Sequence, residues 1–181
     1  MYPFKPLNDS DIRTVIILPA VDTEAEIRCE LYHREFDPGT YSALSYVWGN
    51  PNPRKTIYIE DTAVEVTPNL FAALRSLRHT SSKVCLWVDA LCINQDDVLE
   101  KRSQVKRMTE IYAEAMTVFM WLGEEEGDSD LAMALLHRLE KELRGNFIRT
   151  NEKATLMTLL GRPYWFRVWI IQEIVTAHHA I

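Results

Sequence analysis

Cysteine is scarce in this sequence, and the cysteines that are present do not cluster. The chain of 181 residues contains three of them, Cys29, Cys85 and Cys92, and none are spaced as Cys-x-x-Cys. An odd number of widely spaced cysteines argues against a disulfide framework and against a zinc site. We therefore predict a protein with reduced thiols and no bound metal. Reduced thiols in turn favour a cytoplasmic location.

Glycine-rich nucleotide motifs are also missing. The six glycines are scattered, and the sequence contains neither Gly-x-Gly-x-x-Gly nor a P-loop. A dehydrogenase-type site for a resident dinucleotide and a P-loop site for a nucleoside triphosphate are therefore not expected. We predict that the protein carries no cofactor. A nucleotide bound by this chain would have to be a substrate.

Neither positive charge nor apolar sequence is concentrated enough for a nucleic-acid-binding or membrane-spanning protein. The formal net charge is −6, whereas a nucleic-acid platform needs a clustered positive surface. The densest basic stretch, 101–107, alternates with apolar residues, which fits a solvated helix face or a phosphate-binding stripe. The longest aliphatic run, Val15 to Leu18, stops at Pro19 and falls far short of the about 18 residues of a membrane span.

What is present is a chain with a real apolar core and regular periodicity. Hydrophobic residues make up 47% and charged residues 25% of the chain, a balance typical of globular proteins. From residue 41 onward buried strands alternate with helices, which predicts an α/β domain with a parallel sheet preceded by antiparallel strands. The strands are expected at 12–18, 26–33, 41–47, 56–60, 63–66, 84–88 and 117–122. The helices are expected after Thr67, after Asp97, after the acidic loop 124–128, at 152–160 and around Glu173.

Polar and aromatic residues collect just after three of the expected strands. These positions are 46–49, 89–95 and 121–123. In open α/β sheets, ligands bind outside the carboxyl ends of the parallel strands. Asp89 and Asn94 are therefore expected either to line a site at this edge or to make turns and caps, as such residues often do after a strand.

One acidic residue stands out in the apolar segment near the C-terminus. The segment 165–175 has the pattern of an aromatic helix, in which Glu173 lies one turn from Trp169 and two turns from Phe166. A buried carboxylate without a partner is costly or shifts its pKa upward. Glu173 is therefore expected to have either a structural partner, with Arg167 and Arg162 as candidates, or a chemical role.

Four blocks of sequence are distinctive when they are taken in order. They are Tyr41–Gly49 (YSALSYVWG), Leu86–Asp96 (LWVDALCINQD), a third block made of Glu100, Arg102, Gln104, Val105, Met108, Ile111 and Tyr112, and Arg162–Glu173 (RPYWFRVWIIQE). Together they resemble the fungal heterokaryon incompatibility (HET) domain. The resemblance extends from about residue 12 to residue 181, so we predict a single HET domain over 1–181. It implies a role in nonself recognition and regulated cell death in filamentous fungi, with incompatibility receptors as partners.

The HET family is similar to Toll/interleukin-1 receptor (TIR) domains, so the resemblance implies a TIR-like, flavodoxin-like parallel sheet flanked by helices. Several TIR domains hydrolyse NAD with a glutamate on the helix after the third strand, and the matching residue here is Glu173. The resemblance thus implies an NAD glycohydrolase that releases nicotinamide and ADP-ribose, and self-association through the domain. Substrate contacts carry over to Ser45, Trp48 and Gly49.

A single carboxylate is sufficient for this chemistry. Glycosidases use two carboxylates, but nicotinamide leaves its ribose as a neutral group and needs no general acid. An ionised Glu173 near the ribose would stabilise the oxocarbenium-like transition state or form a covalent adduct. Trp48 or Trp169 would stack on one of the rings. The alternative from a different class is a non-enzymatic signalling module that acts through self-association.

Three further points leave alternatives open. A TIR-like sheet continues with strands after the glutamate helix, so here either the N-terminal strands complete the sheet or the domain is incomplete at its C-terminus. Glu100 either completes a capping box with Asp97 or reaches the site. Cys92 lies near Asp89 in the sequence and is expected to be structural rather than a nucleophile.

Overall fold

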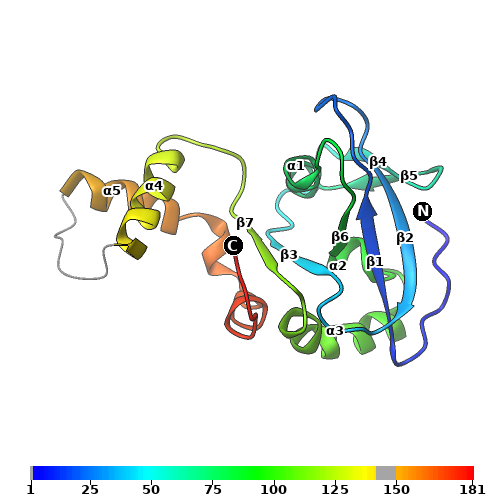
Figure 1. The fold of residues 1–181 in the computed structure, drawn as a ribbon. Helices are drawn as coiled ribbons and strands as arrows, with labels where there is room; N and C mark the ends of the chain where they lie inside the picture. The colour runs from blue at the N-terminus through cyan, green and yellow to red at the C-terminus, as the bar shows by residue number, and fades with distance from the viewer. Residues whose placement is uncertain (1, 142–149) are drawn as a thin grey trace.

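The computed structural model describes residues 2–141 and 150–181, and a mixed seven-stranded sheet lies at its centre (Figure 1). The strand order is β5-β4-β2-β1-β6-β3-β7. The strands are β1 (Asp11–Ile17), β2 (Arg28–Glu35), β3 (Ser42–Tyr46), β4 (Lys55–Ile59), β5 (Thr62–Val66), β6 (Val84–Trp87) and β7 (Val118–Trp121). β3 runs parallel to both of its neighbours, β6 and β7, whereas β1 pairs antiparallel with β2 and β6.

The predicted α/β class is confirmed, with a parallel part and antiparallel strands from the N-terminal region. β1 and β2 belong to the same sheet as β3. This is the alternative in which the N-terminal strands complete the sheet. The predicted hairpin is β4–β5, and it lies at the edge of the sheet with Ile59 paired to Thr62. The carboxyl ends of β3, β6 and β7 meet at one edge, because these three strands run in the same direction.

Helices accompany the sheet and extend past its β7 edge. They are α1 (Pro68–Leu77), α2 (Asp89–Cys92), α3 (Val98–Ala113), α4 (Ser129–Lys141) and α5 (Thr150–Leu160), followed by the 3₁₀ turn η1 (Pro163–Phe166) and the π-helical turn η2 (Ile171–Val175). In Figure 1, α4 and α5 lie side by side beyond β7, and η2, at the red end of the chain, lies against α3. No helix in the described part of the chain has the length and apolar character needed to cross a membrane.

The core joins α3 to the strands that end at the candidate site. Trp87 of β6 and Tyr112 of α3 are buried, and their rings meet edge to face with centroids 5.4 Å apart. The Tyr112 hydroxyl donates to the Leu44 carbonyl at 3.1 Å, and the Tyr41 hydroxyl donates to the Ile111 carbonyl at 2.7 Å. Buried aromatic residues contribute large apolar area, and here both tyrosine hydroxyls also have a hydrogen-bond acceptor. These contacts hold α3 against β3, so η2, which packs on α3, is held as well.

The predicted helix over 165–175 is wrong. η1 ends at Phe166, Arg167 is extended (φ −78°, ψ 133°), and η2 begins only at Ile171. Phe166 and Trp169, expected to surround Glu173, are 77% and 45% exposed. The extended residue changes the direction of the chain, so the aromatic residues turn outward while Glu173 turns into the protein.

Neither of the two roles considered for Glu100 is found, because it completes no capping box and does not line the Glu173 cleft described below. The Asp97 side chain caps α3 as expected, but the Glu100 carboxylate accepts from Arg13 through both oxygens, at 2.5 and 2.8 Å, and from the Asn94 amide at 2.7 Å. Arg13 is 1% exposed, and its guanidinium also donates to backbone carbonyls. A buried guanidinium needs a counter-charge, so Glu100 pairs with it instead of turning back to the helix start.

Replacing Asp97 by alanine should lower the free energy of unfolding by about 1 kcal/mol, since Leu99 and Glu100 lose the acceptor for their amides. The matched control is Asp96→Ala, because Asp96 is exposed and its carboxylate caps no amide in the described residues. That variant should stay within about 0.5 kcal/mol of the wild type. Urea denaturation followed by circular dichroism measures both. Equal losses would contradict the capping role.

Candidate functional site

Glu173 is fully buried, and three donors hold its carboxylate. Arg167 approaches in a bidentate manner, with Nη2 2.8 Å from Oε1 and Nη1 2.8 Å from Oε2. The Ser45 hydroxyl donates to Oε2 at 2.5 Å. Bidentate arginine–carboxylate pairs are among the strongest polar interactions in proteins. The buried negative charge therefore has a well-matched partner.

A fourth residue supports this arrangement from behind. The Tyr164 hydroxyl lies 2.7 Å from Ser45 Oγ, and Tyr164 is fully buried. Ser45 gives its only proton to Glu173, so Tyr164 must be the donor in this contact. Burial raises the pKa of Tyr164 to about 12, which keeps its hydroxyl protonated. We call Ser45, Tyr164, Arg167 and Glu173 the Glu173 cluster.

The local backbone explains how these residues meet. Ser45 lies on β3, Tyr164 lies in η1, and the extended Arg167 follows η1 directly. Glu173 lies in the π-helical turn, where its amide donates to the Trp169 carbonyl at 3.1 Å. π-helical turns are rare and frequently occur at functional sites. The turn directs Glu173 toward β3 and leaves its neighbours Ile171 and Val175 exposed.

The Glu173 cluster borders a cleft of about 570 Å³, which we call the Glu173 cleft. It is lined by Val47, Trp48, Gly49, Asp89, Ile93, Gln95, Lys101, Val105, Met108, Arg167, Trp169 and Glu173. The volume falls in the range of about 300–1,000 Å³ that is typical of small-molecule sites. The Glu173 side chain is 1% exposed and that of Arg167 is 17% exposed. The arginine is therefore the more accessible member of the pair.

Asp89 adds a second carboxyl group to this cleft. The Trp48 indole N–H donates to Asp89 Oδ2 at 2.8 Å, which fixes the orientation of a ring that is 44% exposed. Burial raises the pKa of Asp89, and the nearby charge of Glu173 adds to that shift, while the Trp48 and Ala90 hydrogen bonds oppose it. A carboxyl with a raised pKa is better suited to take up a proton than an exposed one.

The structure brings most of the predicted site residues together. Trp48, Gly49, Asp89, Trp169 and Glu173 all line the Glu173 cleft. Gly49 has φ +69°, a conformation that favours glycine, and it lets the chain turn at the end of β3. The edge formed by the strand ends is thus where these side chains gather, as the sequence pattern predicted.

Two predicted site residues lie elsewhere. Ser45 is fully buried and does not line the cleft; its hydroxyl holds Glu173 instead. Asn94 also lies outside the cleft. Its amide donates to Glu100 and its side chain accepts from the Asp96 amide at 3.3 Å, so it has the turn role that is common for such residues after a strand.

The sequence pattern indicates one residue that supports Glu173 and gives little signal for the others. Arg167 was one of two candidate partners for Glu173 and is the partner found, whereas Arg162 donates to the Leu122 carbonyl and to Ser129 Oγ. Lys101 lines the cleft. It belongs to the basic stretch 101–107, for which a phosphate-binding role is one of the two interpretations of the sequence. Tyr164 had no signal except its place within the fourth sequence block.

The cysteine alternative finds no support in this geometry. Cys92 is 1% exposed and does not line the cleft, and its sulfur accepts from the Val88 amide at 3.3 Å. Burial raises the pKa of its thiol to about 12, so almost no nucleophilic thiolate forms near neutral pH. Within the described residues, no group of three or more His, Cys, Asp and Glu is placed to hold a metal ion.

Comparisons with known proteins place this site inside a matched segment. A family model described as "Heterokaryon incompatibility protein (HET)" matches residues 41–173. The chain is also 33% identical over 145 residues to "Heterokaryon incompatibility protein 6, OR allele" of Neurospora crassa, a match that covers 72% of this chain and 21% of that relative. The chain thus matches about a fifth of the length of that relative. No solved structure matches. Residues 41–173 include the whole Glu173 cluster and every residue that lines the Glu173 cleft.

Iodoacetamide at about pH 8 should leave Cys29 and Cys92 unmodified in the native protein. Both thiols are buried, and burial raises the pKa of each to about 12, so the thiolate fraction stays very low. Peptide mass spectrometry after the reaction measures modification at each cysteine. Protein unfolded in guanidinium serves as the control, in which all cysteines should react. Rapid labelling of native Cys92 would contradict the structural assignment.

Arg167→Met should lower the free energy of unfolding by about 3–5 kcal/mol, because it leaves the buried Glu173 charge unpaired. Adding Glu173→Leu should recover part of that loss, with a coupling energy of about 1–3 kcal/mol in a double-mutant cycle.

The matched control for this cycle is the Arg28–Glu26 pair, whose side chains are 50% and 56% exposed. Its coupling energy should be below about 1 kcal/mol, since solvent screens exposed pairs. Urea unfolding of all variants gives both cycles. Equal coupling in the two pairs would contradict the view that the Arg167–Glu173 pair is a buried, specific interaction.

Proposed function

Because the chain belongs to the heterokaryon incompatibility (HET) family, we propose that it is an effector domain of fungal nonself recognition and cell death. We further propose that this domain hydrolyses NAD. The reaction takes place in the Glu173 cleft and releases nicotinamide and ADP-ribose, in the manner of a TIR domain. The observation that carries the proposal is Glu173 itself, a carboxylate at the wall of a nucleotide-sized cleft with two partly exposed tryptophans.

The bonds involved explain which groups are needed. The bond between C1′ of the ribose and the ring nitrogen breaks, its electron pair goes to that nitrogen, and nicotinamide leaves as a neutral molecule. Water then adds its oxygen to C1′ and loses a proton. Glu173 stabilises the positive charge that develops on the ribose. Asp89, whose pKa is raised by burial, is suited to accept the proton from water.

The aromatic side chains supply the binding surfaces for the substrate rings. Trp48 and Trp169 both line the cleft and are 44% and 45% exposed, so each offers part of a ring face. The nicotinamide ring of NAD is cationic, and cations are attracted to the face of an indole. Because Asp89 holds the Trp48 indole N–H, this face is already oriented before a ligand binds.

Glu173 has to be released before it can act. Arg167 and Ser45 occupy both of its oxygens, and its side chain is 1% exposed. Arginine binds phosphate groups with the same bidentate geometry that it uses for carboxylates. We therefore propose an exchange of partners, in which a phosphate of the dinucleotide binds Arg167 and frees Glu173. Arg167 already lines the cleft and lies between the two helical turns rather than within one.

A second candidate function is favoured by the surface next to the Glu173 cluster. Five large apolar residues of the segment 166–175 are exposed: Phe166, Val168, Trp169, Ile171 and Val175. Several exposed apolar side chains within one short segment are a candidate for a protein–protein interaction site. In this alternative the domain is a non-enzymatic module that acts through self-association, and the Arg167–Glu173 pair only fixes the shape of that surface.

Incubation of the purified protein with NAD separates these two functions. Nicotinamide release, followed by liquid chromatography, should fall at least about 100-fold in Glu173→Gln, because the neutral amide does not stabilise the developing cation. The matched control is Glu35→Gln on β2, an exposed residue outside the cleft, which should retain full activity. Sedimentation of each variant checks that its assembly is unchanged.

Equal nicotinamide release by the wild type and Glu173→Gln would remove Glu173 from the mechanism. The self-association module would be favoured by a different pair of results. The wild type would release no nicotinamide, and Phe166→Asp would lose both assembly and the cell death seen on expression. Cell death that is lost in Glu173→Gln with assembly intact would favour the enzyme.

A further inference from the structure

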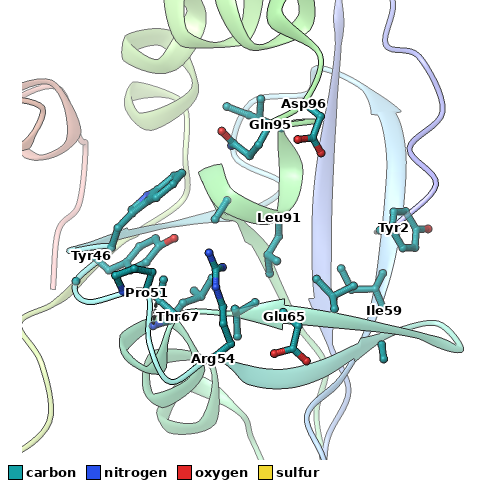
Figure 2. Close-up of a pocket in the computed structure, with 18 of the residues that line it drawn as sticks. Tyr2, Tyr46, Pro51, Arg54, Ile59, Glu65, Thr67, Leu91, Gln95 and Asp96 are labelled. Atoms are coloured by element: carbon teal, nitrogen blue, oxygen red, sulfur yellow. Dashed lines mark hydrogen bonds between the residues drawn. The ribbon is translucent and has the colours of Figure 1, made fainter.

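A second, larger cavity adjoins the Glu173 cleft. Its volume is about 690 Å³, and its walls come from the β4–β5 hairpin, α1, α2 and the N-terminal segment (Figure 2). The two cavities share four lining residues, Trp48, Gly49, Ile93 and Gln95. They are therefore neighbours, with the oriented Trp48 ring as a common wall.

The lining of this cavity suits a planar ring. Ile59, Val66, Leu70 and Leu91 contribute buried apolar side chains, and each is no more than 4% exposed. Aromatic rings from Tyr2, Phe4, Tyr46 and Trp48 complete the walls. Flat apolar surfaces combined with aromatic rings are the usual environment of a bound base.

Arg54 is the only basic residue among those that line this cavity. Figure 2 shows its side chain reaching into the cavity, between Tyr46 and Leu91. Its guanidinium makes no hydrogen bond or ion pair within the residues that the structure describes. An arginine without a protein partner is well suited to bind a phosphate through two parallel hydrogen bonds.

Two carboxylates, Glu65 and Asp96, line the same cavity. Glu65 accepts from the Thr56 hydroxyl at 2.7 Å, and the Asp96 carboxylate accepts no hydrogen bond from the described residues. Two acids in the same cavity as one arginine do not favour a bare anion. They do suit a ligand that has hydroxyl donors as well as a phosphate, since carboxylates commonly bind ribose hydroxyls.

We propose that this cavity binds the base, ribose and phosphate of a mononucleotide unit, with the phosphate on Arg54. The inference rests on the proposed function in one respect, which is that the other half of the same dinucleotide occupies the Glu173 cleft. Trp48 then separates the two rings, and the phosphates lie between Arg54 and Arg167. Binding in this cavity is measurable without any bond being cleaved.

The test is calorimetric titration of the protein with adenosine 5′-monophosphate and, separately, with adenosine. Arg54→Ala should weaken binding of the monophosphate about tenfold, because it removes a charged hydrogen-bonding partner of the phosphate. Binding of adenosine should change by less than about twofold, since adenosine has no phosphate. The matched control is Arg102→Ala, which removes the same charge from an exposed residue that lines neither cavity.

A second variant tests the base rather than the phosphate. Ala63 lines the cavity and is exposed, so Ala63→Trp should fill it and weaken both ligands at least about tenfold, with the fold checked by circular dichroism. Absence of monophosphate binding by the wild type, or an equal effect of Arg54→Ala on both ligands, would overturn the inference. Neither ligand contains the bond that Glu173 is proposed to cleave, so a failure of NAD hydrolysis leaves these results unchanged.

Discussion

The bidentate pair between Arg167 and Glu173 is the constraint on which the site depends. A carboxylate that is fully buried must have its charge matched and its oxygens hydrogen-bonded, because isolated buried charge is very costly. That requirement accounts for the extended residue between η1 and η2, for the serine on β3 and for the tyrosine behind it. It also accounts for the exposed aromatic and aliphatic side chains of the same segment, because turning Glu173 inward turns its neighbours outward.

The pattern of strands and helices was readable from the sequence because burial imposes it locally. Alternating and apolar runs located the strands of the sheet, Thr67 and Asp97 marked the starts of two helices, and polar residues after β3 and β6 marked the edge where the cleft lies. Glu173 was recognisable because a charge in an apolar run is unusual in any fold.

The remaining features depend on contacts that are distant in the sequence. The segment 165–175 contains no glycine or proline, so nothing local signals that the helix breaks at Arg167; the break follows from pairing with Glu173 across the turn. In the same way, Glu100 has the spacing of a capping residue, but it forms an ion pair with the buried Arg13 of β1 instead. Ser45 has a position typical of a ligand contact, yet the sheet buries it beneath the cleft.

In this HET domain, an arginine at the wall of the cleft thus binds a buried glutamate through both of its oxygens. The most direct test of the proposed exchange of partners is a crystal structure with an NAD analogue in which a methylene group replaces the ring oxygen of the nicotinamide ribose, so that it resists cleavage. We predict that Arg167 binds a phosphate of the analogue and that the Glu173 carboxylate lies beside the ribose. An analogue bound in the cleft with the Arg167–Glu173 pair intact, or bound away from the cleft, would contradict this prediction.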